Sequence, residues 1–203
     1  MPSRPTQKRP AISEKRRDDL IRAAYQAIAE RGFEGLRTRD VAAEVGVNIA
    51  TLHYYFPTKE SLIRGVVDHA MTRFRSTLTP HGTPSDQLRN HLRAVRKLLN
   101  DEPELGAVMA ELALRSARDE EIEKLLGEMF LGWHTTMRGL LRRAVREGGL
   151  RPELDSPGVA SSLMATLTAL MLPVLSSTQV GDQALGQLEK WLGISPPRKR
   201  GLG

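Results

Sequence analysis

The sequence contains no cysteine among its 203 residues. Disulfide bonds, thiolate metal sites and cysteine nucleophiles are therefore excluded. Aromatic residues are also scarce, at 4%, whereas 40% of the residues are hydrophobic, so we expect a core built from leucine, alanine, valine and methionine. A chain of this length forms one large domain, or a small domain joined to a larger one.

Long hydrophobic runs are missing as well. The most apolar stretch, residues 159–175, is interrupted by serines, threonines and Pro173. It falls short of the roughly 20 apolar residues that a membrane span needs. The N-terminus is basic and polar and shows no secretory signal. We therefore expect a soluble, cytoplasmic protein that does not act at a membrane.

The usual signatures of enzymes are absent. There is no glycine-rich phosphate loop, nucleophile elbow, metal-binding histidine pair or serine–lysine signature, and the five histidines are scattered. An acidic cluster spans residues 119–123, but carboxylates at a helix start are favoured by the helix dipole alone, and no histidine is interleaved with them. We predict no catalytic residue, no cofactor and no metal site.

The net charge of +6 is concentrated at the two ends of the chain. Residues 1–17 hold six lysines and arginines against one glutamate, and residues 198–200 read Arg-Lys-Arg. We interpret residues 1–12 as a disordered basic arm suited to phosphate neutralisation or minor-groove contact. We interpret residues 195–203 as a basic tail that aids solubility.

Residues 38–56 contain two short helical segments joined by a tight glycine turn. Thr38 is predicted to cap the first segment through its hydroxyl, and Asp40 complements the positive end of that helix. Gly46 ends the segment, because glycine adopts a left-handed conformation without a Cβ clash. This spacing is too close for two ordinary helices of a bundle.

The second segment is predicted to be an exposed reading helix. Asn48 caps it, while Leu52 and Phe56, four residues apart, face inward. The outward positions are Ile49, Ala50, His53 and Tyr54. A helix, a glycine turn and a second helix with a contact-capable face fit a DNA-reading helix-turn-helix.

The rest of the chain reads as further helices, with no strand pattern or internal repeat. A helix over 13–31 precedes the helix-turn-helix, and a fourth opens at residues 57–60 with Thr58 as its cap. The others are predicted at 85–100, 103–118, 119–147, 157–176 and 182–192. The fold class is all-α. We predict an N-terminal three-helix helix-turn-helix domain at 13–62. The fourth helix of the chain joins it to a larger helical domain at 63–194.

The segment 157–176 is apolar or small on most faces, so it must be covered on nearly all sides, and a second copy of the chain is a natural cover. We predict a homodimer. Its interface would use Val159, Leu163, Leu170, Val174, Leu185, Leu188, Trp191 and Leu192.

Together these residues resemble the N-terminal domain of the TetR family of bacterial transcriptional regulators. The resemblance covers Asp18–His69, about a quarter of the chain. It rests on Gly32-Phe33, Thr38-Arg39-Asp40-Val41-Ala42, Gly46-Val47, Thr51-Leu52, Tyr55-Phe56 and Lys59-Glu60-Ser61-Leu62. Asn48 stands where the family commonly has serine, and His53 where it commonly has tyrosine. Beyond about Ala70 the resemblance is architectural, and it implies a helical domain that binds a ligand and dimerises.

The predicted DNA-contacting set is Thr38, Arg39, Asn48, Ile49, Ala50, Thr51, His53, Tyr54, Tyr55 and Lys59. Lys59 can reach a phosphate, and hydroxyls of Thr38, Tyr54 and Tyr55 can donate to phosphates. Thr38 and Tyr55 have an equally good structural reading, as helix cap and core aromatic. The resemblance implies that position 39 reaches a base edge, where an arginine engages guanine. Residues 49–53 face the bases, and a dimer would read a near-palindromic operator.

The C-terminal domain is predicted to bind a small-molecule effector that shifts the protein to a state mismatched to its operator. The lining set is Met109, Leu112, Phe130, Trp133, His134, Met137, Met164, Leu167 and Met171. Such a stripe also fits plain core. The function predicted is a ligand-released repressor on double-stranded DNA. The alternatives are an architectural DNA-binding protein without effector and, less favoured, a helical enzyme.

Overall fold

The computed structural model describes residues 8–176 and 179–194, with side chains from Ser13 onward except at Pro173 and Ser176. Within these residues the chain forms α-helices, one short 3-10 helix and no strand. The predicted all-α class is confirmed. No helix in this part of the chain is long and apolar enough to cross a membrane.

The chain folds into two compact units. The N-terminal unit contains the chain up to Met71 together with Ala107–Leu125, and the C-terminal unit contains Thr72–Gly106 together with the chain after Leu125. The predicted division between residues 62 and 63 falls inside a continuous helix, α4 (Lys59–Arg75). A second difference is that part of the predicted C-terminal domain, residues 107–125, packs with the N-terminal helices.

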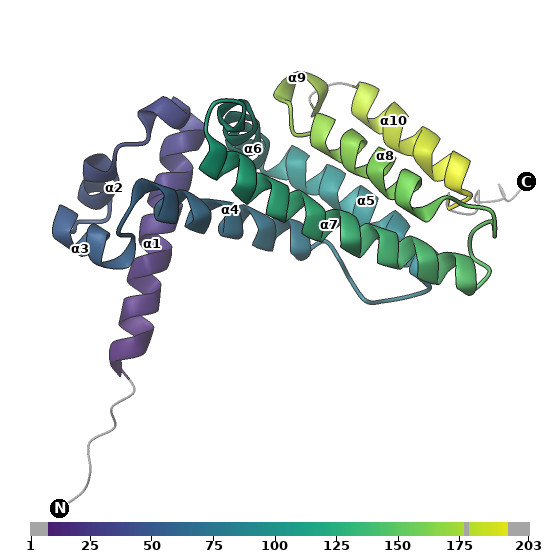
Figure 1. Cartoon of the computed structure of the whole chain (residues 1–203), viewed down its shortest axis with the longest axis horizontal. Helices are drawn as coiled ribbons and strands as arrows, with labels where there is room; N and C mark the ends of the chain where they lie inside the picture. The colour runs from purple at the N-terminus through teal and green to yellow at the C-terminus, as the bar shows by residue number, and fades with distance from the viewer. Residues whose placement is uncertain (1–7, 177–178, 195–203) are drawn as a thin grey trace, which may run out of the picture. The chain divides into compact units, whose positions relative to one another are not determined.

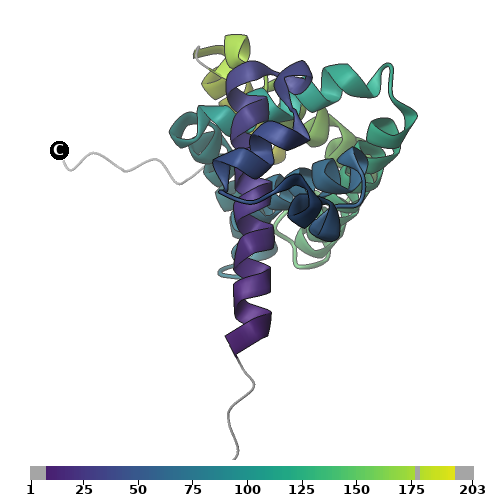
Figure 2. The same cartoon turned by 90° about the vertical axis from the view of Figure 1, so that its left-hand side faces the viewer.

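In the N-terminal unit, α4 is preceded by α1 (Lys8–Arg31), the 3-10 helix η1 (Phe33–Gly35), α2 (Thr38–Glu44) and α3 (Ile49–Tyr55). Helix α1 begins at Lys8 and not at Ser13, so the last residues of the expected disordered arm are helical; the rest of that arm lies outside the described residues. Pro10 is compatible with this start, because a backbone N–H in the first helical turn has no intrahelical partner anyway. Figure 2 shows the N-terminal part of α1 projecting beyond the other helices of this unit.

The core of the N-terminal unit lies between the second half of α1 and the helices that cross it. Leu20, Ala24 and Ile28 form the buried stripe of α1. The residues buried against this stripe from the following elements include Phe33, Leu36, Val41, Ala42, Leu52, Phe56, Leu62 and Val66. This apolar layer fixes α2 and α3 as one rigid piece on α1.

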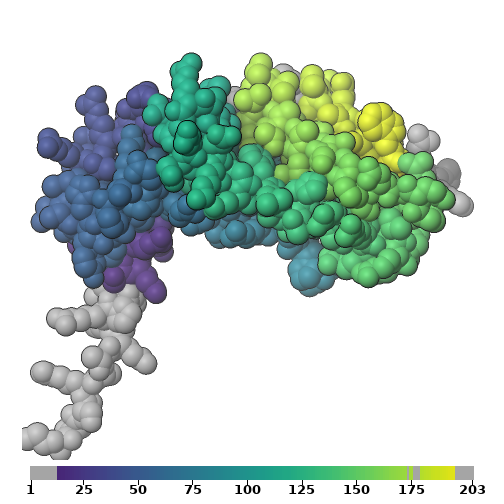
Figure 3. Space-filling model, viewed as in Figure 1, coloured from purple at the N-terminus to yellow at the C-terminus, as the bar shows by residue number. Residues whose placement is uncertain are grey.

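The C-terminal unit is a bundle of longer helices. Its elements are the end of α4, α5 (Pro84–Asp101), the start of α6 (Pro103–Ser116), most of α7 (Glu120–Arg146), α8 (Ser156–Ala169), α9 (Pro173–Ser176) and α10 (Gln179–Leu192). Helices α8 and α10 lie side by side and both pack on α5 (Figure 1). Their side chains close the space between the ribbons, as the space-filling view shows (Figure 3).

The helix predicted over 157–176 is broken into two pieces. Helix α8 ends at Ala169, and α9 starts at Pro173. A proline nitrogen has no hydrogen to donate to the carbonyl four residues earlier, and here that carbonyl belongs to Ala169. The prediction of one continuous helix was therefore wrong, and Pro173 is the reason.

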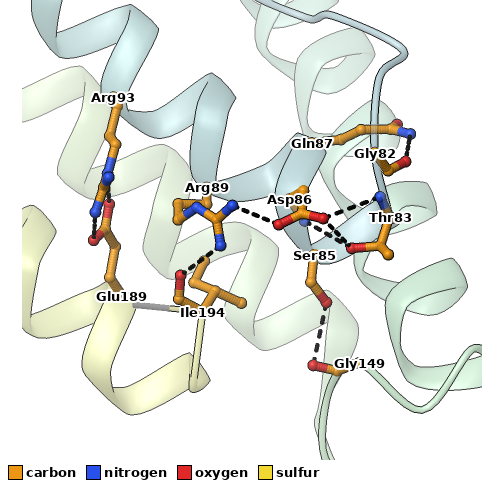
Figure 4. A network of polar contacts seen from close by, with 10 residues as sticks. All are labelled: Gly82, Thr83, Ser85, Asp86, Gln87, Arg89, Arg93, Gly149, Glu189 and Ile194. Carbon is orange, nitrogen blue, oxygen red and sulfur yellow. Dashed lines mark hydrogen bonds and ion pairs between the residues drawn. The ribbon is translucent and has the colours of Figure 1, made fainter. Parts of the chain in front are cut away.

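Polar contacts tie α5 to its neighbours (Figure 4). At its start, Thr83 accepts from the Asp86 backbone N–H while the Asp86 carboxylate accepts from Thr83, forming a capping box. These bonds, with one from Arg89, lower the pKa of Asp86. Further along, the Arg93 guanidinium donates two hydrogen bonds, of 2.7 and 2.6 Å, to the Glu189 carboxylate on α10. The start of α5 is thus fixed by its own capping box, and its middle is held by the ion pair with α10.

Candidate functional site

Helix α2 begins differently from the prediction. Arg37, and not Thr38, is the N-cap residue, with an extended backbone and no side-chain cap hydrogen bond. Thr38 is already the first helical residue, so its hydroxyl does not cap the helix. The reason lies in backbone geometry, since a cap residue must stay outside the helical region of φ and ψ. Asp40 does lie in the first turn, as predicted.

The turn between α2 and α3 follows the prediction. Gly46 has a φ of 69°, in the left-handed region that glycine adopts without a Cβ clash. Asn48 is the N-cap of α3, and its Oδ1 accepts from the Thr51 backbone N–H at 2.8 Å and from the Thr51 hydroxyl at 2.9 Å. The two short helices are therefore locked at a fixed angle by local chemistry.

Helix α3 presents one face to solvent and buries the other. Leu52 and the following Phe56 are buried beneath it, which confirms their inward prediction. Ala50 and His53 are exposed, and Ile49, Thr51 and Tyr55 are half-buried. The Tyr54 ring is 79% exposed and stands edge-on to Tyr55, with ring centroids 5.2 Å apart. Together with exposed Arg39 on α2, this face is free to meet a groove or a ligand.

The start of α4 adds a cation beside this face. Thr58 and Ser61 exchange hydrogen bonds, the Ser61 backbone N–H reaching Thr58 Oγ1 at 3.1 Å and the Thr58 N–H reaching Ser61 Oγ at 3.2 Å. The predicted Thr58 cap is confirmed. Lys59 is half-buried, with its Nζ 4.6 Å from the centroid of the Phe33 ring. Its ammonium group therefore lies over that ring, and Lys59 is the first residue of the helix.

Sequence patterns did not identify three further residues around this face. The Arg17 guanidinium of α1 lies 5.2 Å from the Phe56 ring centroid, just beyond the end of α3. Glu111 and Arg115 of α6 contact the turn between α1 and α2. In the sequence, Arg17 is one of several basic residues and nothing distinguishes it from the others. The α6 contacts join residues about eighty positions apart, and no local pattern reveals such a pairing.

The acidic cluster at 119–123 has a structural explanation. Asp119 directly precedes α7, and its Oδ1 accepts from the Ile122 backbone N–H at 3.3 Å. Glu120, Glu121 and Glu123 lie in the first turn of that helix. In the part of the chain that the structure describes, no cluster of three or more potential metal ligands occurs.

The residues predicted to line an effector site are mostly buried, in two different units. Met109 and Leu112 belong to the N-terminal unit. In the C-terminal unit the buried members are Trp133, Met137, Met164, Leu167 and Met171, and Phe130 and His134 are half-buried. The His134 Nε2 lies 3.2 Å from the Ser161 hydroxyl on α8. Buried methionine and tryptophan fit a ligand lining and ordinary core alike.

A buried polar chain runs beside Trp133. The Trp133 indole N–H donates to His91 Nε2 at 3.1 Å, and His91 Nδ1 lies 2.7 Å from the Thr77 hydroxyl, which in turn donates to the Phe74 carbonyl at 2.6 Å. An indole is only a donor, so Nε2 must be the acceptor and the proton of the neutral ring sits on Nδ1. Every donor then has an acceptor. Burial lowers the pKa of His91 to about 4, so the ring is neutral at physiological pH.

The predicted dimer residues also divide by burial. Leu163, Leu170, Leu185 and Leu192 are buried within the protomer, and Val159 and Leu188 are half-buried. Val174 and Trp191 are 71% and 66% exposed, and Leu172 and Val180, which were not predicted, are exposed beside them in the chain. Exposed apolar side chains thus occur on the α8–α9 turn, α9 and α10, and also at Leu114 of α6 and Leu131 of α7.

Comparisons with known proteins agree with this geometry. Residues 20–66 match the family described as "Bacterial regulatory proteins, tetR family", and residues 78–185 match "Tetracyclin repressor-like, C-terminal domain". Among curated proteins, the nucleoid occlusion factor SlmA of Photobacterium profundum is 29% identical over 155 residues, covering 73% of this chain and 78% of its own. The transcriptional repressor KstR2 of Mycolicibacterium smegmatis is 24% identical over 195 residues, covering 87% and 90%.

Solved structures give the same fold. A TetR transcription regulator from Haloarcula marismortui superposes with a TM-score of 0.79 over 89% of this chain and 97% of its own, at 18% identity. The second family match alone spans more than half of the chain. The helix-turn-helix of α2 and α3, the helical C-terminal part and these matches lead to one conclusion: the chain belongs to the TetR family of bacterial transcriptional regulators.

Proposed function

We propose that this regulator is a repressor that binds a near-palindromic operator as a homodimer and leaves it when a small molecule binds its C-terminal part. The observation that carries the proposal is the exposed face of α3, capped by Asn48 and held rigid by buried Leu52 and Phe56. A helix that is already formed loses little conformational entropy when it binds in a major groove.

We assign the DNA contacts by exposure and chemistry. Lys59, Tyr54 and Arg17 are placed to neutralise or hydrogen-bond phosphates around α3. Thr38 and Tyr55 are half-buried, which fits a mixed role in packing and phosphate contact. The side chains assigned to base edges are Arg39, Ile49, Ala50, Thr51 and His53.

The dimer is proposed to form through the exposed apolar surface of the α8–α9 turn, α9 and α10. Val174, Val180 and Trp191 are large hydrophobic side chains more than half exposed. Large exposed apolar side chains that gather into one patch mark interaction sites. A two-fold axis would then relate the two α3 helices, so that the operator has two matching half-sites about one helical turn apart or somewhat more.

The effector is proposed to be an uncharged, largely apolar molecule. Apart from His134, the predicted lining in the C-terminal unit is apolar, and His91 beside Trp133 is neutral and already bonded at both nitrogens. The buried charges described in this unit are paired, Arg96 with Asp182 and Glu189 with Arg93. An anionic ligand would therefore lose its hydration without gaining a free counter-ion. If such a ligand bound free and DNA-bound protein equally tightly, the proposed release mechanism would be wrong.

Selection of bound sequences from a random pool of double-stranded DNA tests the proposal as a whole. We expect a palindromic consensus, and weaker binding as salt rises. The second candidate is an architectural DNA-binding protein without an effector, and the similarity to a protein named for the nucleoid is in keeping with DNA binding. Binding without sequence preference would support that second candidate, and absence of binding would exclude both.

Two substitutions then separate the contact types on the selected operator. We expect Arg39→Ala to lose discrimination at one base position, by about 5- to 100-fold, because a bidentate guanine contact provides that range. We expect Lys59→Ala to weaken all sequences alike and to reduce the salt dependence by about one released counterion per subunit. Quantitative binding titrations at several salt concentrations measure both effects. Unchanged affinity and salt dependence in both variants would refute this assignment.

A further inference from the structure

The turn between α1 and α2 is held from outside by helix α6. The backbone N–H of Phe33 donates to the Glu111 carboxylate, Oε2, at 3.0 Å. The turn has no side-chain cap of its own, because its N-cap residue is Gly32. A Cβ added at Gly32 would lie 3.0 Å from the same carboxylate oxygen, and the φ of Gly32 is 69°. Glu111 therefore takes the place of a cap and approaches as closely as glycine allows.

One helical turn further along α6, Arg115 contacts the next part of the same turn. Its Nη1 donates to the Glu34 carboxylate at 3.2 Å, and its guanidinium carbon lies 4.9 Å from the Phe33 ring centroid. Its Nε also donates to Asp119 at 3.4 Å. Glu111 thus holds the backbone of Phe33 and Arg115 contacts its ring, from positions one turn apart on α6.

The ring that Arg115 touches is also the support of Lys59. The Lys59 Nζ lies 4.6 Å from the Phe33 ring centroid, and Phe33 itself is buried. All of these contacts lie within the N-terminal unit. The position of this ring therefore influences where the Lys59 ammonium group lies, and hence where its charge can meet a phosphate.

We propose that Glu111 and Arg115 are positioning residues for DNA binding, which hold Phe33 so that Lys59 is placed for its phosphate although neither residue touches DNA. This inference rests on the proposed DNA contact of Lys59. Lysine has a long side chain that loses much rotamer freedom when it is fixed, so an ammonium group already held at a ring loses less entropy on binding a phosphate than a free one. The α6 contacts are needed because the turn contains Gly32 and Gly35 and has no cap of its own.

The test uses the full-length protein and the operator selected above. The variants are Arg115→Met, Lys59→Ala and the double variant, with Glu111→Ala and its conservative partner Glu111→Gln, which keeps an acceptor for the Phe33 N–H. We expect Arg115→Met and Glu111→Ala to weaken operator and unrelated DNA equally, by about 2- to 5-fold, the range that one cation–π contact provides. We expect Glu111→Gln to bind nearly as the unmodified protein does.

Two readouts separate positioning from a loss of stability. Arg115→Met should reduce the salt dependence as Lys59→Ala does, whereas partial unfolding lowers the active fraction without changing that slope. The double variant should be no weaker than Lys59→Ala alone, because the two residues act through one contact. Arg118→Met is the matched control: it removes the same charge from an exposed position after the end of α6 and should leave the slope unchanged.

Independent, multiplying effects of Arg115→Met and Lys59→Ala would overturn the inference, as would an unchanged salt dependence in Arg115→Met. An unchanged Lys59→Ala would overturn both the inference and the Lys59 contact, while a selected palindrome would still support the regulator. Failure of the unmodified protein to select any sequence would instead contradict the proposed function.

Discussion

At the scale of single residues, His91 places an ionisable ring in the interior of the C-terminal unit. The ring is fully buried and hydrogen-bonded to Trp133 and Thr77. Its neutral form satisfies every partner, because Nε2 accepts and Nδ1 donates. Protonation would put a hydrogen on Nε2, facing the indole N–H of Trp133, so the charged ring loses one bond as well as its hydration.

We expect this residue to make the protein less stable in mild acid. Burial lowers the pKa of His91 from 6.5 to about 4, against a smaller opposing contribution from a hydrogen bond with Thr77. Between these values the unfolded chain binds more protons than the native state. The contribution to stability is therefore complete above pH 6.5 and is lost as the pH falls toward 4. The shift corresponds to on the order of 3 kcal/mol in the free energy of unfolding.

Chemical denaturation at pH 7 and pH 4.5 measures this effect. We expect His91→Gln to be less stable than the unmodified protein at pH 7 but to lose less stability on acidification. His81→Gln is the control, since His81 is exposed in the loop before α5 and its replacement should leave the pH profile unchanged. Parallel pH profiles for the unmodified protein and His91→Gln would contradict the prediction.

At the scale of helices, Asn48 has two roles that substitutions can separate. It caps α3 through the Thr51 N–H, and it lies exposed at the end of the helix that we propose enters the groove. We expect Asn48→Ala to reduce the free energy of unfolding by about 1 kcal/mol, the usual effect of losing a cap. We expect Asn48→Asp to keep that stability, because aspartate also caps, yet to weaken DNA binding by repelling phosphates. Thermal unfolding and operator titrations of both variants measure the two effects; equal stability of Asn48→Ala and the unmodified protein would show that the cap contributes little.

The helices also show what could and could not be predicted from the sequence. Asn48, Gly46 and the inward pair Leu52 and Phe56 follow from rules that act over a few residues, and the structure confirms them. The break before Pro173 follows from the same kind of rule. The apolar residues on both sides of this proline, however, continue at helical spacing, which favours a single helix. Helix α1 begins at Lys8, five residues before its predicted start. The prolines and charged residues of that stretch are typical of disorder, so the sequence does not indicate the earlier start.

Contacts between segments far apart in the sequence could not be predicted from local sequence patterns. Glu111 and Arg115 reach Phe33 and Glu34 across about eighty positions of sequence, and the Trp133–His91 bond joins two helices forty-two positions apart. Hydrophobic periodicity identifies which face of a helix is buried but not which helix covers it. The local geometry of the helix-turn-helix could be predicted because it is one short motif, whereas the lining of an effector site depends on tertiary packing.

At the scale of the whole molecule, the exposed apolar residues of α9 and α10 imply a partner. We expect Trp191→Asp to shift the protein from dimer to monomer, because it puts a charge within the proposed interface. Operator affinity should fall with it, since a monomer meets only one half-site. Sedimentation velocity measures the oligomeric state, and DNA titration measures the affinity. Leu131→Asp is the matched control, as Leu131 is 67% exposed on α7 and lies outside the proposed interface. A dimeric Trp191→Asp variant would place the interface elsewhere.

The contrast between the two tryptophans has a practical consequence. The chain contains two of them; Trp133 is 3% exposed and bonded to His91, while Trp191 is 66% exposed on α10. Their fluorescence should therefore differ in colour and in access to soluble quenchers such as iodide. In Trp191→Phe the remaining emission reports the interior beside His91, and in Trp133→Phe it reports the surface where a second copy would sit. The molecule thus carries its own two optical probes, one for the occupancy of its interior and one for its association.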